Sequence, residues 1–421
     1  MSHEPSPVMP AASSSALLHR DYRTYFTTSM LTMMGDNIEH VISYWIIFKA
    51  FDSPALAGFA VISHWLPYFL SMHFGALADR YDCRIIIRIS QLTFAMASLG
   101  WGSLYLAGIL EMWHAGALLV LHGFSGAVQG PANQLVIHDI VGRRQLHSAV
   151  RLNATATQLG FLIGPAVGAG LMIAFGPGPG LLINVLSYIP RTVWTLRVPY
   201  SGHLSQEETA RPYTRLGFRD MVAVLRELSS NRRIISMIML AGSSSLLVGN
   251  AFQAQMPEFA ADLGSDSGLA YGALVAATAG GAVAGGLLLD GLGWLQTKAS
   301  LAIICAFFWA LSVAAFAAAS TYALAFLLLL IGGGLQLAFS SMAQTLVQLE
   351  SPIDLRGRAI GLFHIFFAGL RVGSGFTVGV IGGIIGIHWS LGLSSLALLP
   401  IFMGLLVFAL APARERALSR V

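Results

Sequence analysis

Three ionisable residues lie near the middle of the first long apolar run of the chain, residues 24–48. Asp36, Glu39 and His40 are three and four residues apart, a spacing that places their side chains on one face of a helix. Ionisable groups inside an apolar segment are costly, so each is a functional candidate. A carboxyl there can bind and release a proton when its surroundings change. We expect this of Asp36 first and Glu39 second, with His40 beside them; a static buried ion pair is the alternative.

A second ionisable pair lies in a late apolar run, residues 359–384, where His364 and Arg371 are seven residues, or two helical turns, apart. Arg371 needs a partner or water at this position. Asp36 lies at a comparable depth, so we expect the two residues to pair or to share a cavity. The alternative is an Arg371 guanidinium bonded to backbone carbonyls. Two lone histidines are expected to be packing residues: His64 and His73.

Uncharged polar side chains form a stripe in the run 321–347. Gln336, Ser340 and Gln344 follow one another at steps of four, which places them on one helix face. A polar stripe would be costly in lipid, so we expect it to line a wet cavity. Polar and aromatic residues of other runs are expected to line the same cavity: Tyr44, Gln129, Asn133, Asn250, Gln253 and His364.

The composition shows what surrounds these groups. Of the 421 residues, 55% are hydrophobic and only 10% are charged, against about 25% charged in a soluble domain. Too little polar surface remains to cover a water-soluble globule, so lipid must solvate the chain. The sequence holds no GxxxxGK[ST] loop, no GxSxG motif and no CxxC spacing. We therefore expect no enzyme activity, no cofactor and no metal site, and we do not read the net charge of +4 as affinity for nucleic acid.

Twelve apolar runs are long enough to cross about 30 Å of hydrocarbon as helices. Only helices and closed barrels satisfy their backbone hydrogen bonds in lipid, and the runs lack the period-two alternation of barrel strands. The sequence therefore predicts an all-α membrane protein. The runs are 24–48, 55–77, 86–108, 114–138, 149–174, 180–198, 234–258, 269–291, 299–318, 321–347, 359–384 and 389–411.

Basic residues indicate the orientation of these runs. One set of connecting loops, together with both chain ends, carries nearly all of the 24 lysines and arginines, whereas the opposite set holds only Lys49. Cytoplasmic loops carry the positive excess. We therefore expect both termini in the cytoplasm and a multi-pass protein of the inner or plasma membrane.

A polar stretch divides the chain into two halves of six runs each. Similar motifs begin at Gly75 and Gly286, 211 residues apart, which supports a duplication. Within the polar stretch, residues 213–230 could form an amphipathic helix on the membrane surface or remain a solvated linker. The expected divisions are a disordered cytoplasmic tail (1–20), a first six-helix half (21–198), a cytoplasmic linker (199–232), a second six-helix half (233–412) and a cytoplasmic tail (413–421).

The segment Gly75-Ala-Leu-Ala-Asp-Arg-Tyr-Asp-Cys-Arg84 follows the second run. It resembles the signature loop between helices two and three of the major facilitator superfamily, except that Asp82 stands where the family usually has glycine. The resemblance implies a transporter of two six-helix halves, in which this loop is a cytoplasmic latch that favours the outward-open state. Gly75 would let helices approach closely, and Asp79 would lie at a helix N-terminus or pair with an arginine. The latch residues would be Gly75, Asp79, Arg80 and Arg84.

Small residues recur in the fifth run at Gly160, Gly164, Pro165 and Gly168. Small residues four positions apart let helix backbones touch, and proline kinks a helix. The pattern resembles the motif typical of antiporters within the superfamily. We expect its close-packed partner in the eighth run, which carries glycines at positions 280, 281, 285 and 286.

A longer resemblance covers most of the chain and favours the drug:proton antiporter branch, which contains the enterobactin exporter and macrolide efflux proteins. The chain departs from that branch at Arg371, where a small residue or proline is usual, and at His122, where many antiporters have an arginine. His122 could replace that arginine in a proton relay or could be a packed histidine. The segments that carry the resemblance are Gly130-Pro-Ala-Asn133, Asp139, Arg143, Arg151-Leu-Asn153, the Gly164-Pro165 motif and Asp354-Leu-Arg-Gly-Arg358.

Together these features predict a monomeric, proton-coupled exporter of a small organic molecule, such as a drug or siderophore, that works by alternating access. An uncoupled facilitator or lipid flippase is a second possibility. A third is a metal-ion exporter with Asp36, Glu39, His40 and His364 as ligands. A fourth, a membrane scaffold that transports nothing, is disfavoured by the intramembrane carboxylates.

Overall fold

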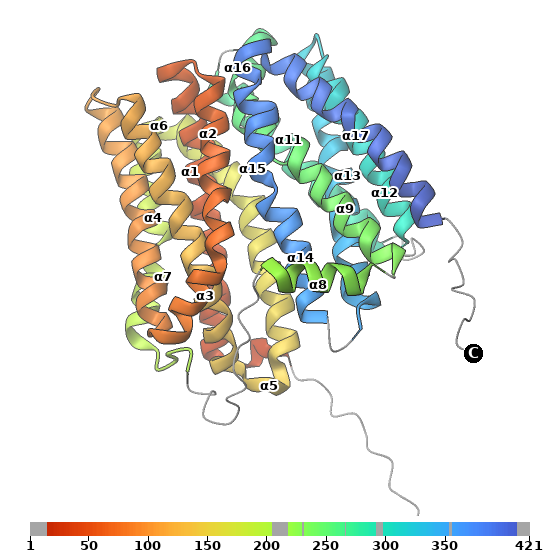
Figure 1. The fold of residues 1–421 in the computed structure, drawn as a ribbon. Coiled ribbons are helices and arrows are strands. Elements are labelled where there is room, and N and C mark those ends of the chain that lie inside the picture. Colours follow the sequence, from red (N-terminus) through yellow and green to blue (C-terminus); the bar gives the residue numbers. More distant parts are fainter. Residues whose placement is uncertain are drawn as a thin grey trace, which may run out of the picture.

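The computed structural model shows two groups of helices side by side (Figure 1). Seven helices of the described residues are long and apolar enough to cross a membrane, or nine when each of two bent helix pairs counts as one span. The prediction of an all-α membrane protein is confirmed. The residues described are 15–203, 218–229, 231–265, 267–291, 298–352 and 356–410.

The N-terminal group, coloured red to yellow-green, contains the first six expected spans. The 3₁₀ segment Leu66–Leu70 joins α2 to α3, and another, Val185–Ser187, joins α6 to α7. The helices are α1 (Arg20–Phe51), α2 (Pro54–Trp65), α3 (Ser71–Arg80), α4 (Cys83–Leu106), α5 (Met112–Phe175), α6 (Pro177–Asn184) and α7 (Ile189–Arg197).

Helix α5 contains both the fourth and the fifth expected spans in 64 residues. Its backbone leaves the helical conformation at Gly142, where φ is 62° and ψ is 179°. A positive φ is strained for residues with a Cβ atom but easily adopted by glycine. Gly142 therefore marks the connection between two spans rather than the middle of one long helix.

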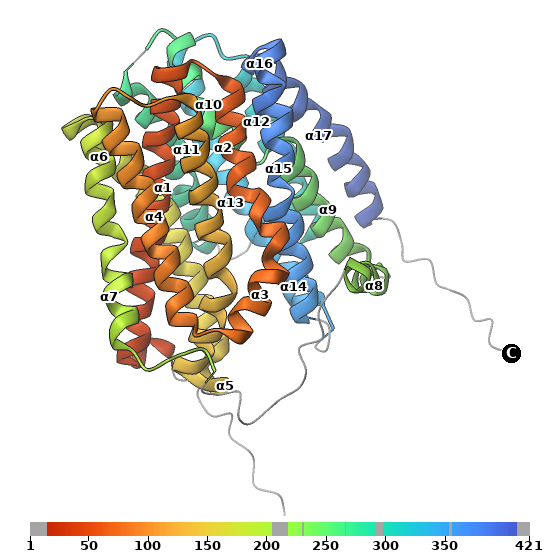
Figure 2. The same cartoon turned by 60° about the vertical axis from the view of Figure 1, so that its left-hand side comes forward.

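The C-terminal group, coloured green to blue, contains the other six expected spans. Helix α8 lies across the ends of this group near α9 and α14 rather than along it, so part of the expected linker is helical (Figure 2). The helices are α8 (Phe218–Leu228), α9 (Arg232–Leu247), α10 (Ala251–Asp262), α11 (Gly268–Gly291), α12 (Ala299–Ala317), α13 (Tyr322–Glu350), α14 (Arg356–His364), α15 (Arg371–Ser374), α16 (Gly382–Ile385) and α17 (Ile387–Leu410).

Three of the expected spans are not among the helices that are long and apolar enough to cross a membrane. They are α1, the first part of α5, and α6 with α7. Helix α1 carries Asp36, Glu39 and His40, which lower its apolarity. The 3₁₀ segment divides α6 from α7, leaving pieces of 8 and 9 residues. Asp36, Glu39 and His40 thus lie in a span that length and apolarity alone do not identify.

Several spans are bent or locally rewound. Helices α9 and α10 meet at 41°, next to Gly249 with its φ of 49°. The eleventh span contains two π-helical segments, Ile365–Gly369 and Gly375–Val380, and Arg371 lies between them. Such π-helical turns are rare and are frequent at functional sites.

The two halves meet closely at the end of the bundle that carries the connection from Phe51 to Pro54, which we call the outer end and which is at the top of Figure 1. A Cβ atom on Gly379 would lie 2.2 Å from the Cα of Gly58, so the two backbones touch. The Tyr271 hydroxyl also donates a hydrogen bond to the Val41 carbonyl, at 3.0 Å. The halves are therefore packed together at the outer end.

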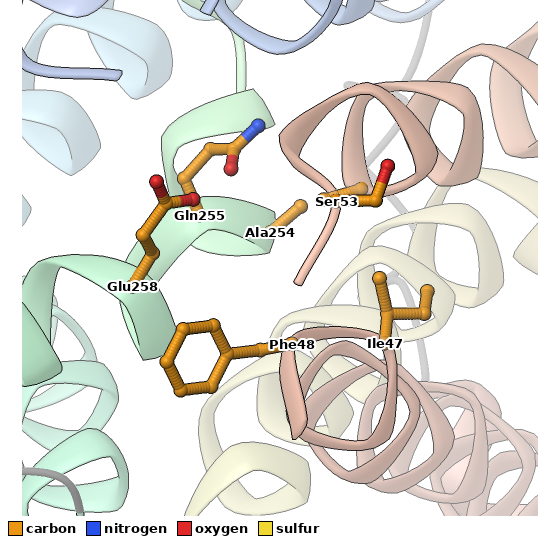
Figure 3. A pocket seen from close by; sticks show the side chains of 7 residues that line it. Ile47, Phe48, Ser53, Ala254, Gln255 and Glu258 are labelled. Atoms are coloured by element: carbon orange, nitrogen blue, oxygen red, sulfur yellow. The ribbon is translucent and has the colours of Figure 1, made fainter. Parts of the chain in front are cut away.

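Figure 3 shows a small pocket within this outer contact. Gln255 and Glu258 of α10 face Phe48 of α1 and Ser53, the residue before α2. The Gln255 Nε2 group donates a hydrogen bond to the Pro54 carbonyl at 3.0 Å. Polar groups of the C-terminal half thus bond directly to the backbone of the N-terminal half here.

Candidate functional site

The centre of the N-terminal half holds an imidazole between two carboxylates. His122 of α5 places Nε2 at 2.8 Å from Asp36 Oδ1 and Nδ1 at 2.7 Å from Glu39 Oε1. Both carboxylates come from α1 and all three side chains are buried, with exposed fractions of 7% for Asp36, 2% for Glu39 and 3% for His122. A proton on His122 therefore has hydrogen-bond acceptors on both sides, as in a short relay.

Neighbouring helices hold Glu39 in place. The Ser98 hydroxyl of α4 donates to Glu39 Oε2. Asn184 of α6 donates from Nδ2 to Ser98 Oγ at 3.1 Å and to the Gly35 carbonyl at 2.9 Å. Because four helices contribute to this network, the position of the Glu39 carboxylate is fixed by more than its own helix.

Two further histidines complete the cluster. His40 Nδ1 lies 3.7 Å from Asp36 Oδ2, and the ring of His64 from α2 lies 4.7 Å from that of His40. One donor atom from each of Asp36, His40, His64 and His122 lies within 4.8 Å of the others. These four residues have the donor types and the closeness to hold a metal ion, whereas the sequence suggested metal ligands only as an alternative and with Glu39 and His364 in place of His64 and His122.

The structure sharpens the expectations for these residues. Asp36, Glu39 and His40 lie together, as their spacing predicts. His64 and His122 are not histidines packed among apolar groups only, because each lies against ionisable neighbours. Ser98 and Asn184 were not predicted, because neither residue type is unusual enough in an apolar run to be noticed.

Arg371 does not form the predicted ion pair with Asp36. Among the residues that the structure describes, no carboxylate lies within salt-bridge distance of it. Its guanidinium carbon instead lies 4.6 Å from the ring centres of Trp65 and Phe367, and its Nε is buried without a hydrogen-bond partner. The Asp36 carboxylate instead bonds to His122, which lies nearer to it.

Two predicted cavity residues of the N-terminal half are engaged in side-chain networks. Gln129 Oε1 accepts a hydrogen bond from Gln91 at 2.9 Å. Asn133 Oδ1 accepts one from Arg191 Nη2 at 2.7 Å, and Arg191 is only 1% exposed. An arginine inside the run 180–198 was the sequence signal for this buried network.

The other predicted cavity residues are spread over both halves. The Tyr44 ring lies 5.5 Å from that of His40, beside the cluster. Ser340 donates to the Gln336 carbonyl at 2.7 Å, and Gln336 lines a small pocket inside the C-terminal half. Asn250 Oδ1 is buried without a partner within the described ranges. The remaining three differ in exposure, since Gln253 and Gln344 are partly buried whereas His364 is exposed.

The fifth and eighth spans contact each other as predicted, for example at Gly272, where a Cβ would lie 2.7 Å from Ala169 Cβ, but the motif glycines of the fifth span face α1 instead. A Cβ atom on Gly164 would lie 2.6 Å from Asn37 Cβ, and one on Gly160 would lie 2.5 Å from Met33 Cβ. Gly168 faces Ile38, and Pro165 lies within the same stretch of α5. The four glycines named in the eighth span, at positions 280, 281, 285 and 286, pack against α13, for example Gly285 against Gly334. The motif therefore supports the part of α1 that carries Asp36.

The contacts of the predicted latch segment differ from the expected ones at Gly75 and Arg84. Gly75 has no atom within 4 Å of a hypothetical Cβ, so it is not a point of close approach here. Arg84 pairs with Asp82 at 2.6 Å, whereas Asp79 and Arg80 are exposed. Partial burial opposes ionisation of Asp82, but hydrogen bonds from Arg84 hold its pKa below the usual range. Asp82, where the family usually has glycine, caps α4 by accepting from the Arg84 backbone N–H.

Comparison with known proteins places these features in a family. The model of a family described as "Transmembrane secretion effector" matches residues 11–420. A putative multidrug resistance protein MdtD of Cronobacter sakazakii is 31% identical over 142 residues, which are 31% of this chain and 29% of that protein. A staphyloferrin A transporter of Staphylococcus aureus is 20% identical over 189 residues, 44% and 48% of the two chains. The chain covers less than two thirds of the length of each relative.

Solved structures of transporters have the same fold. A bacterial homologue of the human lysosomal transporter Spinster, in an inward-facing unoccupied conformation, matches with a TM-score of 0.66 and 15% identity, over 93% of this chain and 97% of that one. The nucleoside transporter NupG matches with a TM-score of 0.69 and 14% identity, over 92% and 99%. At these identities the likeness concerns the fold alone.

Proposed function

Because this chain belongs to the transmembrane secretion effector family of the major facilitator superfamily, and is therefore a membrane transporter rather than an enzyme, we propose that it exports a small organic molecule in exchange for protons. The proposed cargo is of the drug or siderophore class. Two partial relatives, named as a multidrug resistance protein and a staphyloferrin A transporter, support this choice. We propose that a single chain carries out transport as a monomer.

The observation that carries proton exchange is the position of His122 between Asp36 and Glu39. Buried like charges destabilise one another, so the two carboxylates need a proton on His122 or on one of themselves. A substrate bound between the halves would change this balance, and the cluster would then bind or release a proton. Protons and substrate would thereby favour opposite orientations of the two halves.

The packing of the halves suggests how the cluster changes sides. With both termini in the cytoplasm, the contact between Gly58 and Gly379 would lie at the outer side and close it. The His40 side chain, 19% exposed, is the most accessible group among the ion-paired members of the cluster. A rocking of the halves about the central cavity would open the outer contact and expose the cluster to the other side.

A transport experiment tests coupling. Cells that express the chain and cells that lack it are loaded with a panel of drugs and siderophore-type chelators, and efflux is measured before and after a protonophore collapses the proton gradient. We expect efflux of at least one compound that stops on collapse. Efflux that continues unchanged would replace proton coupling by an uncoupled facilitator or a lipid flippase.

A metal-ion exporter is the second candidate, and the cluster of Asp36, His40, His64 and His122 favours it. The set differs from that expected from the sequence, since His364 is not part of it. Cells without the chain would then accumulate more metal ion and become more sensitive to it, while their efflux of organic compounds stays the same. That result would favour this candidate over the first.

A further inference from the structure

We propose that Asp36, His40, His64 and His122 form a binding site for a divalent transition-metal ion of the Zn²⁺ class. One carboxylate and three imidazoles are a donor set that suits Zn²⁺ and its neighbours. Their donor atoms lie within 4.8 Å of one another without an ion. Bonds of about 2.0–2.2 Å place ligand atoms about 3–4 Å apart around the ion, so the wider separations must shorten and the 2.8 Å hydrogen bond between Asp36 and His122 must open to admit it.

An unused donor faces this cluster. His64 is 8% exposed, and its Nδ1 has no hydrogen-bond partner within the part of the chain that the structure describes. The ring of His64 lies 4.7 Å from that of His40 and 5.5 Å from that of His122. The three rings therefore bring their nitrogen donors into one small region. A neutral imidazole with an unpaired nitrogen is ready to bind a metal ion.

The outer ligand shell is already built. His122 Nδ1 lies 2.7 Å from Glu39 Oε1, and Ser98 holds the other oxygen of that carboxylate. A histidine that binds a metal ion through one nitrogen commonly donates its other N–H to a carboxylate, which orients the ring. His122 Nε2 is then directed to the side of Asp36, where the ion would lie. Glu39 accordingly positions a ligand and does not bind the ion itself.

Charge also fits a divalent ion. Asp36 and Glu39 together balance two positive charges, while Arg371, over the ring of Trp65, is an opposing positive charge that acts on His64. Binding of the ion to His122 Nε2 releases to water any proton held there, so metal ions and protons compete for the same atoms. The titratable and charged groups around the cluster are Asp36, Glu39, His40, His64, His122, Tyr44, Tyr68, Tyr188 and Arg371.

The inference deepens the proposed function, on which it rests for its transport role, because an ion that competes with protons is a cargo that proton exchange can move. The ion arrives either free or bound to a small organic chelator. Both sources share the same metal chemistry, so binding is tested with Zn²⁺ alone and with Zn²⁺ supplied as its citrate complex.

Purified full-length protein in nanodiscs provides the test, with Co²⁺ as a spectroscopic probe and Zn²⁺ as competitor. We expect one Co²⁺ per chain, with the strong visible absorption of a tetrahedral site, displaced by one equivalent of Zn²⁺. His64→Ala and His40→Ala should each weaken binding at least about tenfold, because loss of even an outer-shell partner of a metal ligand typically costs that much. The matched control is His73→Ala, since His73 is an exposed histidine of α3 outside the cluster.

Equal Co²⁺ binding by wild type, His64→Ala and His73→Ala would overturn the site, as would the absence of tetrahedral Co²⁺ in wild type. Size-exclusion profiles show whether His64→Ala is folded; if it is not, His40→Ala decides, because its side chain is partly exposed. Failure of metal binding leaves the protonophore experiment unaffected, so the two proposals can fail separately. Binding of Zn²⁺ only when it is supplied as its citrate complex would assign the organic complex as cargo.

Discussion

His122 bonds to two carboxylates that lie one helical turn apart on α1. Charges inside a bilayer are costly unless they are paired. The sequence revealed Asp36 and Glu39 through this cost, because carboxylates in an apolar run are conspicuous. It could not reveal that His122 meets them, since a contact 86 residues away along the chain depends on how two helices pack.

Removing the imidazole tests this pairing. His122→Ala leaves two buried carboxylates without their partner, and loss of one member of a buried ion pair costs about 3–5 kcal/mol. We expect the same substitution to cost much less in an Asp36→Asn background, where one carboxylate is already neutral. A double-mutant cycle of unfolding free energies in detergent measures the difference. Additive effects of the two substitutions would show that the residues do not interact, and His73→Ala serves as the control.

At the scale of elements, the glycines of α5 decide where α1 lies. Backbone contacts at Gly160, Gly164 and Gly168 leave no space for a side chain against Met33, Asn37 and Ile38. Small residues at steps of four predict a close helix contact but not the identity of the partner helix. The sequence therefore predicted the contact between the fifth and eighth spans, which exists at Gly272 and Ala169, but not that the motif glycines themselves face α1.

Substitution in this contact should disturb the site without touching it. A Cβ on Gly164 would meet Asn37 Cβ at 2.6 Å and the Met34 carbonyl oxygen at 2.8 Å, so Gly164→Ala must displace α1. We expect a loss of about 1–3 kcal/mol in stability, as for other overpacked contacts, together with weaker efflux. Gly170→Ala is the matched control on the same helix, since its Cβ meets no atom within 4 Å. Equal effects of the two variants on efflux would contradict the assigned contact.

The N-cap of α4 allows a prediction about pH. Asp82→Ala removes a side-chain cap, typically worth about 1 kcal/mol, and the true value should be at the low end because Asp82 is only partly buried and solvent screens its charge. The pKa of Asp82 is lower in the folded protein, so its contribution is present above the unfolded pKa of about 3.9 and is lost as the pH falls below it. Melting curves of wild type and Asp82→Ala should therefore differ at pH 7 and converge toward pH 3. A difference that persists at low pH would show that the carboxylate charge is not involved.

At the scale of the whole molecule, the two halves are held together at the outer end by backbone contact. Gly58 of α2 lies against Gly375 and Gly379 of the eleventh span. No side chain separates the helices there, so the contact can form and break without side chains having to interdigitate. Such a contact suits a transporter whose halves rock against each other.

A bulky residue at this contact should hold the outer end open. Gly379→Leu cannot fit against Gly58, because even a Cβ would lie 2.2 Å from the Gly58 Cα. We expect Ser53→Cys, whose parent serine lines the pocket at this junction, to react faster with a membrane-impermeant maleimide in the Gly379→Leu background. Gly361→Leu is the control, because a Cβ there meets no atom within 4 Å. Unchanged labelling would place the outer opening elsewhere.

Much of the architecture could be predicted from the sequence, because the length and apolarity of helical spans and the location of basic loops follow directly from the physics of lipid. Contacts between spans could not be predicted in the same way. Arg371 and Asp36 were expected at similar depths, yet the neighbours of Arg371 are the rings of Trp65 and Phe367. The position of a residue along its span follows from the sequence, whereas the residues that face it depend on how the helices pack.

The most direct test of proton exchange at the cluster is Asp36→Asn in proteoliposomes that contain a trapped pH-sensitive dye. The substrate is the compound identified by the efflux panel, and wild type should move protons when that compound is added. Asp36→Asn keeps the size of the side chain but removes its charge, so we predict that substrate-dependent proton movement is abolished while the amount and size-exclusion profile of the protein are unchanged. Undiminished proton movement in Asp36→Asn would contradict the assignment of this cluster as the coupling site.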